Sequence, residues 1–457
     1  MASNPDLARR RPSLANAMAA FALALAPVGC GARGELEDVA GPAPPETTSA
    51  TETAPPTTSS GASTTSTTEA PSPCDVADAD ADGHAAAACG GDDCDDTDPS
   101  VHPGAPDDAA GTWTLSTVAP GPGTFRSTAL ALDAADEPHL AYVDKTSTDL
   151  LWAGRDGDVW KTEVVADAWS GPTRSASLVI DPAGVSHIAY AASGLRYATG
   201  GPGAWQTEVV DETAGTGYHN TSMVAAGGDL HVAYRQLSSI FYQRFDGAVW
   251  SFQVVASNGS AYGADVSIGV DGSQRVHISF ESVIGGDFGQ TTLRYATSAG
   301  GDFQTEDIEE LPPKSGQTYD ALAVTPEGLA HIAYRDGSIG ALRLATGESG
   351  AWTKETVDGT DDAGSHASIA MDARGALHIA YRAAAAKELR HATNASGTWQ
   401  IETVDGQTDT GLYTSVKVDS KGHVHIGYVD AGESTVRHAT NAPAADGVDQ
   451  DCDGQDG

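Results

Sequence analysis

Short runs of alternating apolar and polar residues recur through residues 112–440, and this period predicts strands with two different faces. Several runs begin with an aromatic residue, as in WKTEVV from Trp160, WQTEVV from Trp205 and WQIETV from Trp399. Equivalent runs begin at Trp113, Trp250, Phe303 and Trp352. The span is therefore expected to be all-β and built from repeats.

A second pattern occurs seven times in phase with the first, as HLAY, HIAY, HVAY, HISF or HIGY. Its histidines lie 44 to 54 residues apart: His139, His187, His231, His277, His331, His378 and His425. The last complete repeat divides into four strand-like runs, SIAMD (368–372), LHIAYR (377–382), LRHAT (389–393) and WQIETV (399–404). Four strands in each of seven repeats predict a seven-bladed β-propeller over 112–440.

The two ends of the repeat region are incomplete in a complementary way. The region begins with an unaccompanied outer run, WTLSTV at 113–118, and its last repeat has only SVKVD, VHIGYV and TVRHAT. We therefore expect the N-terminal strand to complete the last blade, because this pairing removes two exposed sheet edges. The segments that flank the propeller would then meet.

The repeated histidines could form a ring of metal ligands or proton donors, but blade symmetry would spread them around the ring. We interpret them as a packing and hydrogen-bonding device. The same interpretation covers the arginines of the LRYAT-like segments, Arg196, Arg294, Arg343, Arg390 and Arg437.

The N-terminus has the features of an export signal over residues 1–30. Arg9 to Arg11 precede the apolar run AMAAFALALAPVG, which is too short to span a bilayer as a mature helix. APVGC resembles the bacterial lipobox, with Pro27 where Leu is usual, so lipidation at Cys30 is expected. Cleavage without a lipid and retention of the segment are the alternatives. Residues 31–73, rich in Thr, Ser and Pro, are expected to be a disordered tether.

The chain is strongly acidic, with 63 Asp and Glu against 25 Lys and Arg. This balance argues against nucleic acid as a partner and favours cations. Two segments carry much of the acidity, 74–111 and 441–457, and each contains a D-x-D-x-D-G pattern, Asp78–Gly83 and Asp449–Gly454. Three alternating carboxylates and a Gly that lets the chain turn suit Ca²⁺.

No Glu closes either loop in the EF-hand manner, since Cys89 holds the twelfth position after Asp78. Further ligands are therefore expected from DDCDDTD. The predicted calcium ligands are Asp78, Asp80, Asp82, Asp92, Asp93, Asp95, Asp96, Asp98, Asp449, Asp451, Asp453 and Asp456.

CGGDDCDDTDPSVHPGAPD and DGVDQDCDGQD resemble the MopE-type metal-binding motif of secreted bacterial proteins. In that family the last element follows the others within a few residues. Here the whole propeller separates them, and Ala445 stands where the family has Cys. The resemblance implies a structural metal module. It also raises copper as an alternative metal, but the available oxygen ligands favour calcium.

Four cysteines besides Cys30, an even number in an exported chain, predict two disulfides among Cys74, Cys89, Cys94 and Cys452. Three pairings are possible. We favour Cys94–Cys452 with Cys74–Cys89, because the first would tie the two acidic segments across the closing strand.

No nucleophile elbow, phosphate loop or HExxH motif occurs, so no catalytic residue is predicted. NASGTW, GESGAW and GGPGAW resemble the Asp-box turns of sialidase-like propellers without the Asp, and the resemblance implies a sialidase-like glycoside hydrolase as one alternative. Such an enzyme would need three arginines on a carboxylate. Arg235, Arg335 and Arg382 follow the tetrad in three blades, with Glu281 equivalent in a fourth, but repetition explains these arginines more simply.

The favoured hypothesis is a monomeric, calcium-binding propeller lipoprotein at the outer membrane or cell surface. It would act in binding or recognition, with a glycan or protein ligand on a propeller face and the membrane reached only through Cys30. A secreted form without the lipid and a copper-binding surface protein are the remaining alternatives.

Overall fold

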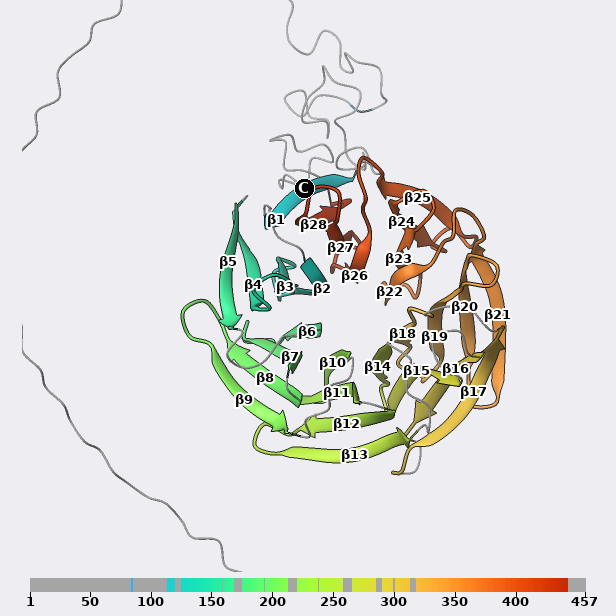
Figure 1. Ribbon diagram of the computed structural model, residues 1–457, viewed down its shortest axis with the longest axis horizontal. Helices are drawn as coiled ribbons and strands as arrows, with labels where there is room; N and C mark the ends of the chain where they lie inside the picture. The colour runs from blue at the N-terminus through green and yellow to red at the C-terminus, as the bar shows by residue number, and fades with distance from the viewer. Residues whose placement is uncertain are drawn as a thin grey trace, which may run out of the picture. The chain divides into compact units, whose positions relative to one another are not determined.

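The computed structural model describes His84 and residues 113–119, 125–157, 159–167, 175–192, 194–212, 220–236, 238–257, 265–284, 290–298, 301–312 and 318–442. Within these ranges the regular elements are twenty-eight strands in seven four-stranded sheets. No helix in the described residues is long and apolar enough to cross a bilayer. The predicted seven-bladed β-propeller is confirmed (Figure 1).

Each blade is an antiparallel sheet whose strands follow chain order from the axis outward. Blade 1 contains β2 (Phe125–Leu132), β3 (Pro138–Asp144), β4 (Leu150–Asp156) and β5 (Val159–Ala166). Blade 2 contains β6 (Ser175–Ile180), β7 (Ser186–Ala192), β8 (Gly194–Gly200) and β9 (Gln206–Asp211). Blade 3 contains β10 (Thr221–Ala226), β11 (Asp229–Gln236), β12 (Ser239–Phe245) and β13 (Trp250–Ser257).

The remaining blades repeat this order. Blade 4 contains β14 (Val266–Val270), β15 (Val276–Ile284), β16 (Gln290–Thr297) and β17 (Gln304–Leu311). Blade 5 contains β18 (Ala321–Val324), β19 (Ala330–Asp336), β20 (Ala341–Glu348) and β21 (Ala351–Asp358). Blade 6 contains β22 (Ser365–Met371), β23 (Leu377–Ala383), β24 (Glu388–Thr393) and β25 (Gln400–Asp405). Blade 7 combines β26 (Leu412–Val418), β27 (Val424–Asp430) and β28 (Thr435–Thr440) with β1 (Thr114–Ala119).

The ring closes as predicted, with β1 as the outer strand of blade 7. β1 pairs antiparallel with β28, so Thr114 lies opposite Thr440 and Leu115 opposite Ala439. Val118, which is 2% exposed, packs in an apolar cluster with Leu130 of blade 1. The first described strand therefore joins the last blade to the first.

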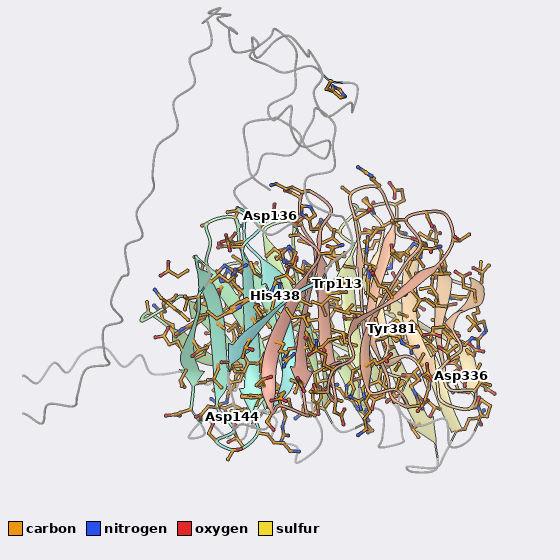
Figure 2. All side chains as sticks on the ribbon, turned by 90° about the horizontal axis from the view of Figure 1, so that it is seen from above. Trp113, Asp136, Asp144, Asp336, Tyr381 and His438 are labelled. Carbon is orange, nitrogen blue, oxygen red and sulfur yellow. The ribbon has the colours of Figure 1, made fainter. Side chains whose placement is uncertain are left out.

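The two faces of the propeller have different roles. In the side view of Figure 2 the strands run between them, with Asp136 at one face and Asp144 at the other. β2 begins at the Asp144 face, because Phe125 pairs with Asp144. β1 begins and β28 ends at the Asp136 face, since Thr440 is opposite His425, which follows the β26–β27 turn. That turn touches Asp136 through Ser420.

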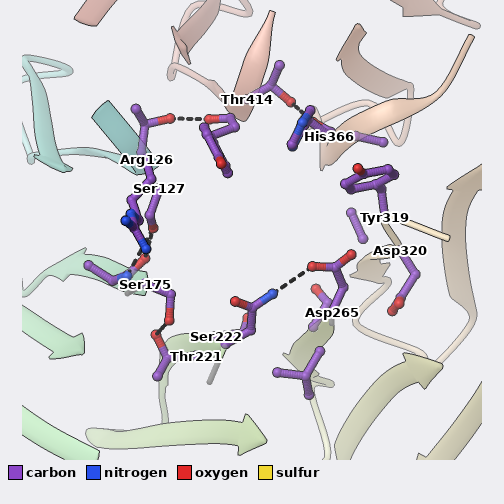
Figure 3. Close-up of a pocket in the computed structure, with 18 residues that line it drawn as sticks. Arg126, Ser127, Ser175, Thr221, Ser222, Asp265, Tyr319, Asp320, His366 and Thr414 are labelled. Atoms are coloured by element: carbon purple, nitrogen blue, oxygen red, sulfur yellow. Dashed lines mark hydrogen bonds between the residues drawn. The ribbon is translucent and has the colours of Figure 1, made fainter. Parts of the chain in front are cut away.

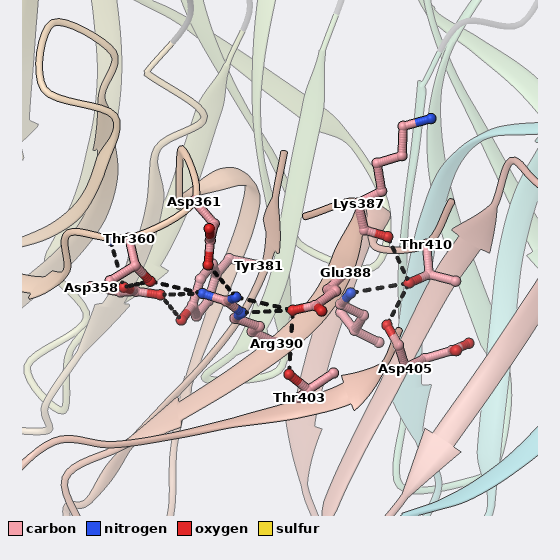
Figure 4. Close-up of polar contacts among 11 residues, drawn as sticks. Asp358, Thr360, Asp361, Tyr381, Lys387, Glu388, Arg390, Thr403, Asp405 and Thr410 are labelled. Carbon is pink, nitrogen blue, oxygen red and sulfur yellow. Dashed lines mark hydrogen bonds and ion pairs between the residues drawn. The ribbon is translucent and has the colours of Figure 1, made fainter. Parts of the chain in front are cut away.

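A buried aromatic residue in the second strand of each blade packs against a neighbouring blade: Tyr142, Tyr190, Tyr234, Phe280, Tyr334, Tyr381 and Tyr428. The hydroxyl of a buried tyrosine is usually hydrogen-bonded. The Tyr381 hydroxyl donates to Asp358 Oδ2 at 2.7 Å, and Arg390 Nη1 donates to the same oxygen at 3.2 Å (Figure 4).

The same triad recurs in other blades, as Tyr428, Asp405 and Arg437 and as Tyr334, Glu309 and Arg343. Each acid belongs to the outer strand of one blade, and its two donors belong to the next blade. The structural role predicted for Arg343, Arg390 and Arg437 is therefore confirmed.

The aromatic residues that begin the outer strands form a second set of contacts between blades. Trp205 Nε1 donates to Glu163 at 3.1 Å, and Trp399 Nε1 donates to Glu355 at 3.2 Å. Trp250 and Trp352 donate in the same way to Glu208 and Glu306. At the closure Ser116 holds the Glu position, and its hydroxyl accepts from Trp160 at 3.0 Å.

The tetrad histidines hold each blade together, as predicted. In blade 1, His139 Nε2 lies 3.3 Å from Asp133 Oδ2, while Asp133 Oδ1 accepts the N–H groups of Ala135 and Glu137 in the turn. The other contacts are His187–Asp181, His231–Tyr242, His277–Asp271, His331–Thr346, His378–His391 and His425–Asp419. Each histidine thus fixes the second strand to a turn or to the third strand.

Removal of the closing strand should cost most of the propeller's stability. Internal deletion of Thr114–Val118 leaves β28 as an exposed edge and uncovers the apolar seam with blade 1. We expect a lower melting temperature and concentration-dependent aggregation, measured by scanning calorimetry and light scattering. The matched control removes five residues of the Thr-rich segment, 60–64, and should melt like the parent; equal melting of both deletions would contradict a closing role.

Candidate functional site

A cavity of about 570 Å³ lies on the propeller axis at the Asp144 face. It is lined by residues at the start of the innermost strand of every blade, including Arg126, Asn220 and Tyr413 (Figure 3). The volume is in the range that holds one small ligand.

Each blade contributes to this cavity one residue from the same repeat position. The position is twelve residues before the tetrad histidine, or eleven in blade 3, where the turn is shorter. We call these residues the axial ring: Ser127, Ser175, Asn220, Asp265, Tyr319, His366 and Tyr413. The tetrad hardly varies between blades, whereas the axial ring is polar throughout and takes five residue types. The seven positions are equivalent in the propeller, so the fold alone gives no reason for the residue to differ from blade to blade.

The axial ring also carries backbone strain. Ser127, Tyr319, His366 and Tyr413 have φ of 56°, 48°, 55° and 53°. In blades 1, 6 and 7 the register of the innermost strand shifts at this position, which marks a β-bulge. Bulges re-aim side chains beside functional sites. A left-handed conformation costs about 1 to 2 kcal/mol for a residue with a Cβ, so glycine would be the cheaper choice here.

Three consecutive blades place aromatic rings side by side along the cavity wall. The ring centroids of Tyr319 and His366 are 4.6 Å apart, and those of His366 and Tyr413 are 4.7 Å apart. Burial, with a smaller effect of Arg382, lowers the pKa of His366 to about 4, so the imidazole is neutral at pH 7. The wall is therefore a continuous uncharged aromatic surface.

Carboxyl groups gather on the blade 4 and blade 5 side of the cavity. Asp265 Oδ1 accepts a hydrogen bond of 2.6 Å from the Asn220 amide, and Asp320 Oδ2 accepts one of 2.6 Å from Ser279. Behind them, Glu281 Oε2 accepts the N–H and hydroxyl of Thr318, each at 3.0 Å. Among the described residues, no donor reaches Asp265 Oδ2, which is shielded from solvent.

Burial and the crowding of carboxyl groups raise the pKa of Asp265 and of Asp320. Burial, with the charge of Glu281 acting in the same direction, raises the pKa of Asp320 to about 7. Burial and the charges of Glu281 and Asp320 raise the pKa of Asp265 well above its usual range, although Asn220 and Arg235 oppose the rise. At neutral pH this side of the cavity therefore holds protons as well as negative charge.

Arg126 of blade 1 supplies positive charge on another side of the cavity. Its Nε is buried and has no hydrogen-bond partner among the described residues. Burial raises the pKa of Tyr413, and the Arg126 guanidinium opposes that rise, so the two side chains are neighbours in the cavity.

The metal and lipid sites predicted from the sequence lie outside the described residues. This applies to all twelve Asp ligands, to Cys30 and to the four cysteines of the predicted disulfides. In the part of the chain that the structure describes, no group of three or more His, Cys, Asp or Glu residues is placed to hold a metal ion.

The arginines that follow the tetrad have different roles. Arg335 pairs with Asp362 at 2.6 Å and Arg382 with Asp409 at 2.5 Å, each in the loop that leads to the next blade. Their predicted repeat role is confirmed. Arg235 is 4% exposed, and its charge interacts with Glu281 and Asp265. In blades 3 and 4 this repeat position therefore supports the cavity wall.

The sequence-based prediction missed the axial ring, Arg126 and Asp320. The signal was present in the sequence as a repeat position, eleven or twelve residues before the tetrad histidine, at which the polar residue changes from blade to blade.

The sequence matches no family model and no curated protein. Among solved structures it is similar to virginiamycin B lyase from Staphylococcus aureus, with 12% identity, 72% of this chain and 99% of that chain covered and a TM-score of 0.49. The Aleuria aurantia lectin bound to alpha-methyl-L-fucoside is 14% identical, with 63% of this chain and 98% of that chain covered and a TM-score of 0.44. The Hadza microbial sialidase Hz136 is 12% identical, with 69% of this chain and 65% of that chain covered and a TM-score of 0.38. Such distant likenesses concern the propeller architecture and carry no argument about function.

The strain at Tyr413 can be measured with paired substitutions. Tyr413→Gly and Tyr413→Ala remove the same ring, but only glycine accepts the positive φ without cost. We expect the Gly variant to be about 1 kcal/mol more stable than the Ala variant in urea unfolding. Thr414, whose φ is not positive, is the control position, where the Ala variant should be the more stable one. An Ala variant at 413 as stable as the Gly variant would show that no strain is stored there.

The raised pKa of Asp320 predicts a pH-dependent cost. A carboxyl with a folded pKa near 7 and an unfolded pKa near 3.8 favours the folded state at low pH and loses that contribution as pH rises from about 4 to 7. Asp320→Asn removes the titration. The melting temperature of the variant minus that of the parent should therefore increase between pH 4.5 and pH 7.5. A difference independent of pH would show that Asp320 titrates normally.

Proposed function

We propose that the protein is a non-catalytic binding propeller that holds one small saccharide in the axial cavity. The observation that carries this proposal is the axial ring, a repeat position at which seven blades present varied polar side chains to one cavity despite backbone strain. Strained residues concentrate at ligand sites, where the surrounding structure compensates for their cost.

The composition of the cavity supports a saccharide. Hydroxyl, amide and carboxyl groups of Ser127, Ser175, Asn220 and Asp265 can donate to and accept from sugar hydroxyls. The rings of Tyr319 and Tyr413 offer flat apolar faces with a polar end, which suit the C–H face of a pyranose. A ligand with hydroxyls around its rim and an apolar face would satisfy both kinds of wall.

The contacts of the arginines favour binding over sialidase-like hydrolysis. An arginine triad that grips a carboxylate needs three guanidinium groups directed at one point, whereas Arg335 and Arg382 are paired with Asp362 and Asp409. Arg126 is the arginine that lines the cavity in the described structure. One guanidinium can orient a ligand without forming that triad.

Screening on a glycan array followed by calorimetric titration tests the proposal. Tyr319→Ala, which removes part of the aromatic wall, should raise the Kd of the best array ligand about tenfold or more, a loss of about 1.4 kcal/mol. The control is Phe252→Ser, which removes an aromatic residue 51% exposed on an outer strand, and it should bind like the parent. Absence of any saccharide binding, or equal Kd values for the two variants, would contradict the proposal.

We also propose that the propeller is exported, tethered through Cys30 and clamped by Ca²⁺ at the split acidic motif. The described part of the propeller begins at Trp113 and ends at Ala442, both next to the Thr114–Thr440 pair at the Asp136 face. The cavity is at the opposite face. A tether attached there would leave the cavity open to ligand.

Calcium removal tests the clamp. Since a ligand that binds only the folded state adds RT ln(1 + [L]/Kd), about 3 kcal/mol at a hundredfold excess, EDTA should lower the melting temperature and added calcium should restore it. Asp80→Ala and Asp451→Ala should each reduce this response. The effect should be partial because β1 closes the ring by itself. If the purified protein contains no calcium and EDTA does not change its melting temperature, the calcium clamp is wrong.

A further inference from the structure

We infer that the ligand of the axial cavity is zwitterionic, with an ammonium group that binds Asp265 and Asp320 and a carboxylate that binds Arg126. This inference rests on the proposed function and adds the charge of the ligand to it. Three features of the cavity support it: the separation of its charges, the lack of compensation at each charged end, and the wall between them.

The two charged ends face each other across the axis. Arg126 belongs to blade 1, while Asp265 and Asp320 belong to blades 4 and 5. In a ring of seven, blade 1 lies opposite the boundary between blades 4 and 5. Figure 3 shows Arg126 and the two aspartates on opposite sides of the cavity. A ligand on the axis would therefore meet opposite charges at its two ends.

The negative end has more carboxyl groups than cations. Asp265, Glu281 and Asp320 lie close together, and among the described residues the positive charge of Arg235 acts on Asp265 and Glu281. The neutral donors Asn220, Ser279 and Thr318 satisfy some of the carboxyl oxygens but add no charge. Burial and the neighbouring carboxylates raise the pKa of Asp265 and of Asp320, so both groups hold protons more readily than ordinary carboxyls. A ligand ammonium group would replace those protons with three N–H donors.

The positive end lacks a counter-ion within the described structure. Among the described residues Arg126 forms no ion pair with a carboxylate, in contrast to Arg335 and Arg382, which pair with aspartates. Its guanidinium interacts with the hydroxyl of Tyr413, whose pKa is raised by burial. The guanidinium is therefore available for a carboxylate, which it can hold with two hydrogen bonds.

The aromatic wall connects the two ends. In blade order the cavity presents Asp265, then Tyr319, His366 and Tyr413, and then Arg126. The other side, through Ser175 and Asn220, is neutral and polar. A ligand lying along the wall would place its carbon skeleton on the rings, and Tyr319 could add a cation–π contact to the ammonium group.

Four sugars that share the glucose ring and differ in the groups at C2 and C6 test the inference by calorimetry at pH 7.0. They are glucose, glucosamine with the ammonium, glucuronic acid with the carboxylate, and 2-amino-2-deoxyglucuronic acid with both groups on opposite sides of the ring. We expect the last sugar to bind about tenfold tighter than either singly charged sugar, the effect of one charge-assisted hydrogen bond. A fifth probe, 6-aminohexanoate, carries both charges without a sugar.

Two variants assign the ends. Asp265→Asn should weaken glucosamine and spare glucuronic acid, and Arg126→Gln should do the reverse. The matched controls Asp302→Asn and Arg374→Gln remove the same charges from exposed turns and should change neither affinity. Each variant is checked by its melting temperature, which Asp265→Asn should raise because it removes carboxyl repulsion.

The pH dependence gives an independent readout. Between pH 5.5 and 7.0 the ammonium group of glucosamine stays largely charged while the ionised fraction of Asp320 rises to about half, so glucosamine should bind more tightly at pH 7.0. Glucuronic acid should bind equally at both values. A glucosamine affinity that does not change with pH would overturn the assignment of the ammonium group to this end.

The outcomes separate this inference from the proposed function. If the four sugars bind with Kd values within about threefold, saccharide binding stands and the zwitterionic ligand is wrong. If 6-aminohexanoate binds and no sugar does, the zwitterionic ligand stands and the saccharide proposal is wrong. If no probe binds, both are wrong.

Discussion

The pairing of β1 with β28 is the contact on which the rest of the molecule depends. A four-stranded blade can bury both its faces only between two neighbours, so a row of seven blades would leave two faces and two edges in water. Val118 of β1 packs against blade 1, Leu115 packs in the cluster that joins blade 7 to blade 6, and the hydroxyl of Ser116 accepts the indole N–H of Trp160 from blade 1. Only a closed ring brings the start of all seven innermost strands around one axis. The cavity is therefore a product of closure as much as of its own residues.

Within the ring, some positions of the repeat join neighbouring blades and others line the cavity. Two kinds of hydrogen bond join one blade to the next: those from buried tyrosine hydroxyls to acids, and those from tryptophan indoles to glutamates. They recur because the interfaces between blades have nearly the same geometry. Where the Trp is replaced by Phe303, the preceding blade has Gln253 in place of Glu. An aromatic ring without an N–H no longer needs a charged acceptor. The residues at the blade interfaces thus change together, and the axial ring can vary without affecting these contacts.

This division explains what could be predicted from the sequence. Blade number, strand order and closure follow from periodicity and from the unaccompanied first strand, and the roles of His139, Arg390 and Arg382 follow from repetition. The cavity could not be located in that way. Arg235 holds the same repeat position as Arg382, yet it faces Glu281 and Asp265, because a partner in the neighbouring blade decides what a repeated side chain does. The protonation of Asp265 depends on carboxyl groups from other strands, which are distant in sequence.

A ring of seven similar blades has nearly equivalent positions around its axis, so any chemical direction at the centre must come from the residues that break the repeat. Here the breaks are ordered. Carboxyl groups in blades 4 and 5 are followed by aromatic rings in blades 5 to 7 and then by the guanidinium of blade 1, while blades 2 and 3 supply neutral hydroxyl and amide groups. A ligand that entered with its long axis across the cavity would find one favourable orientation. The left-handed residues at Ser127, Tyr319, His366 and Tyr413 keep their side chains in this arrangement at a cost that the blade interfaces can offset. A nearly symmetric scaffold thereby presents an asymmetric site.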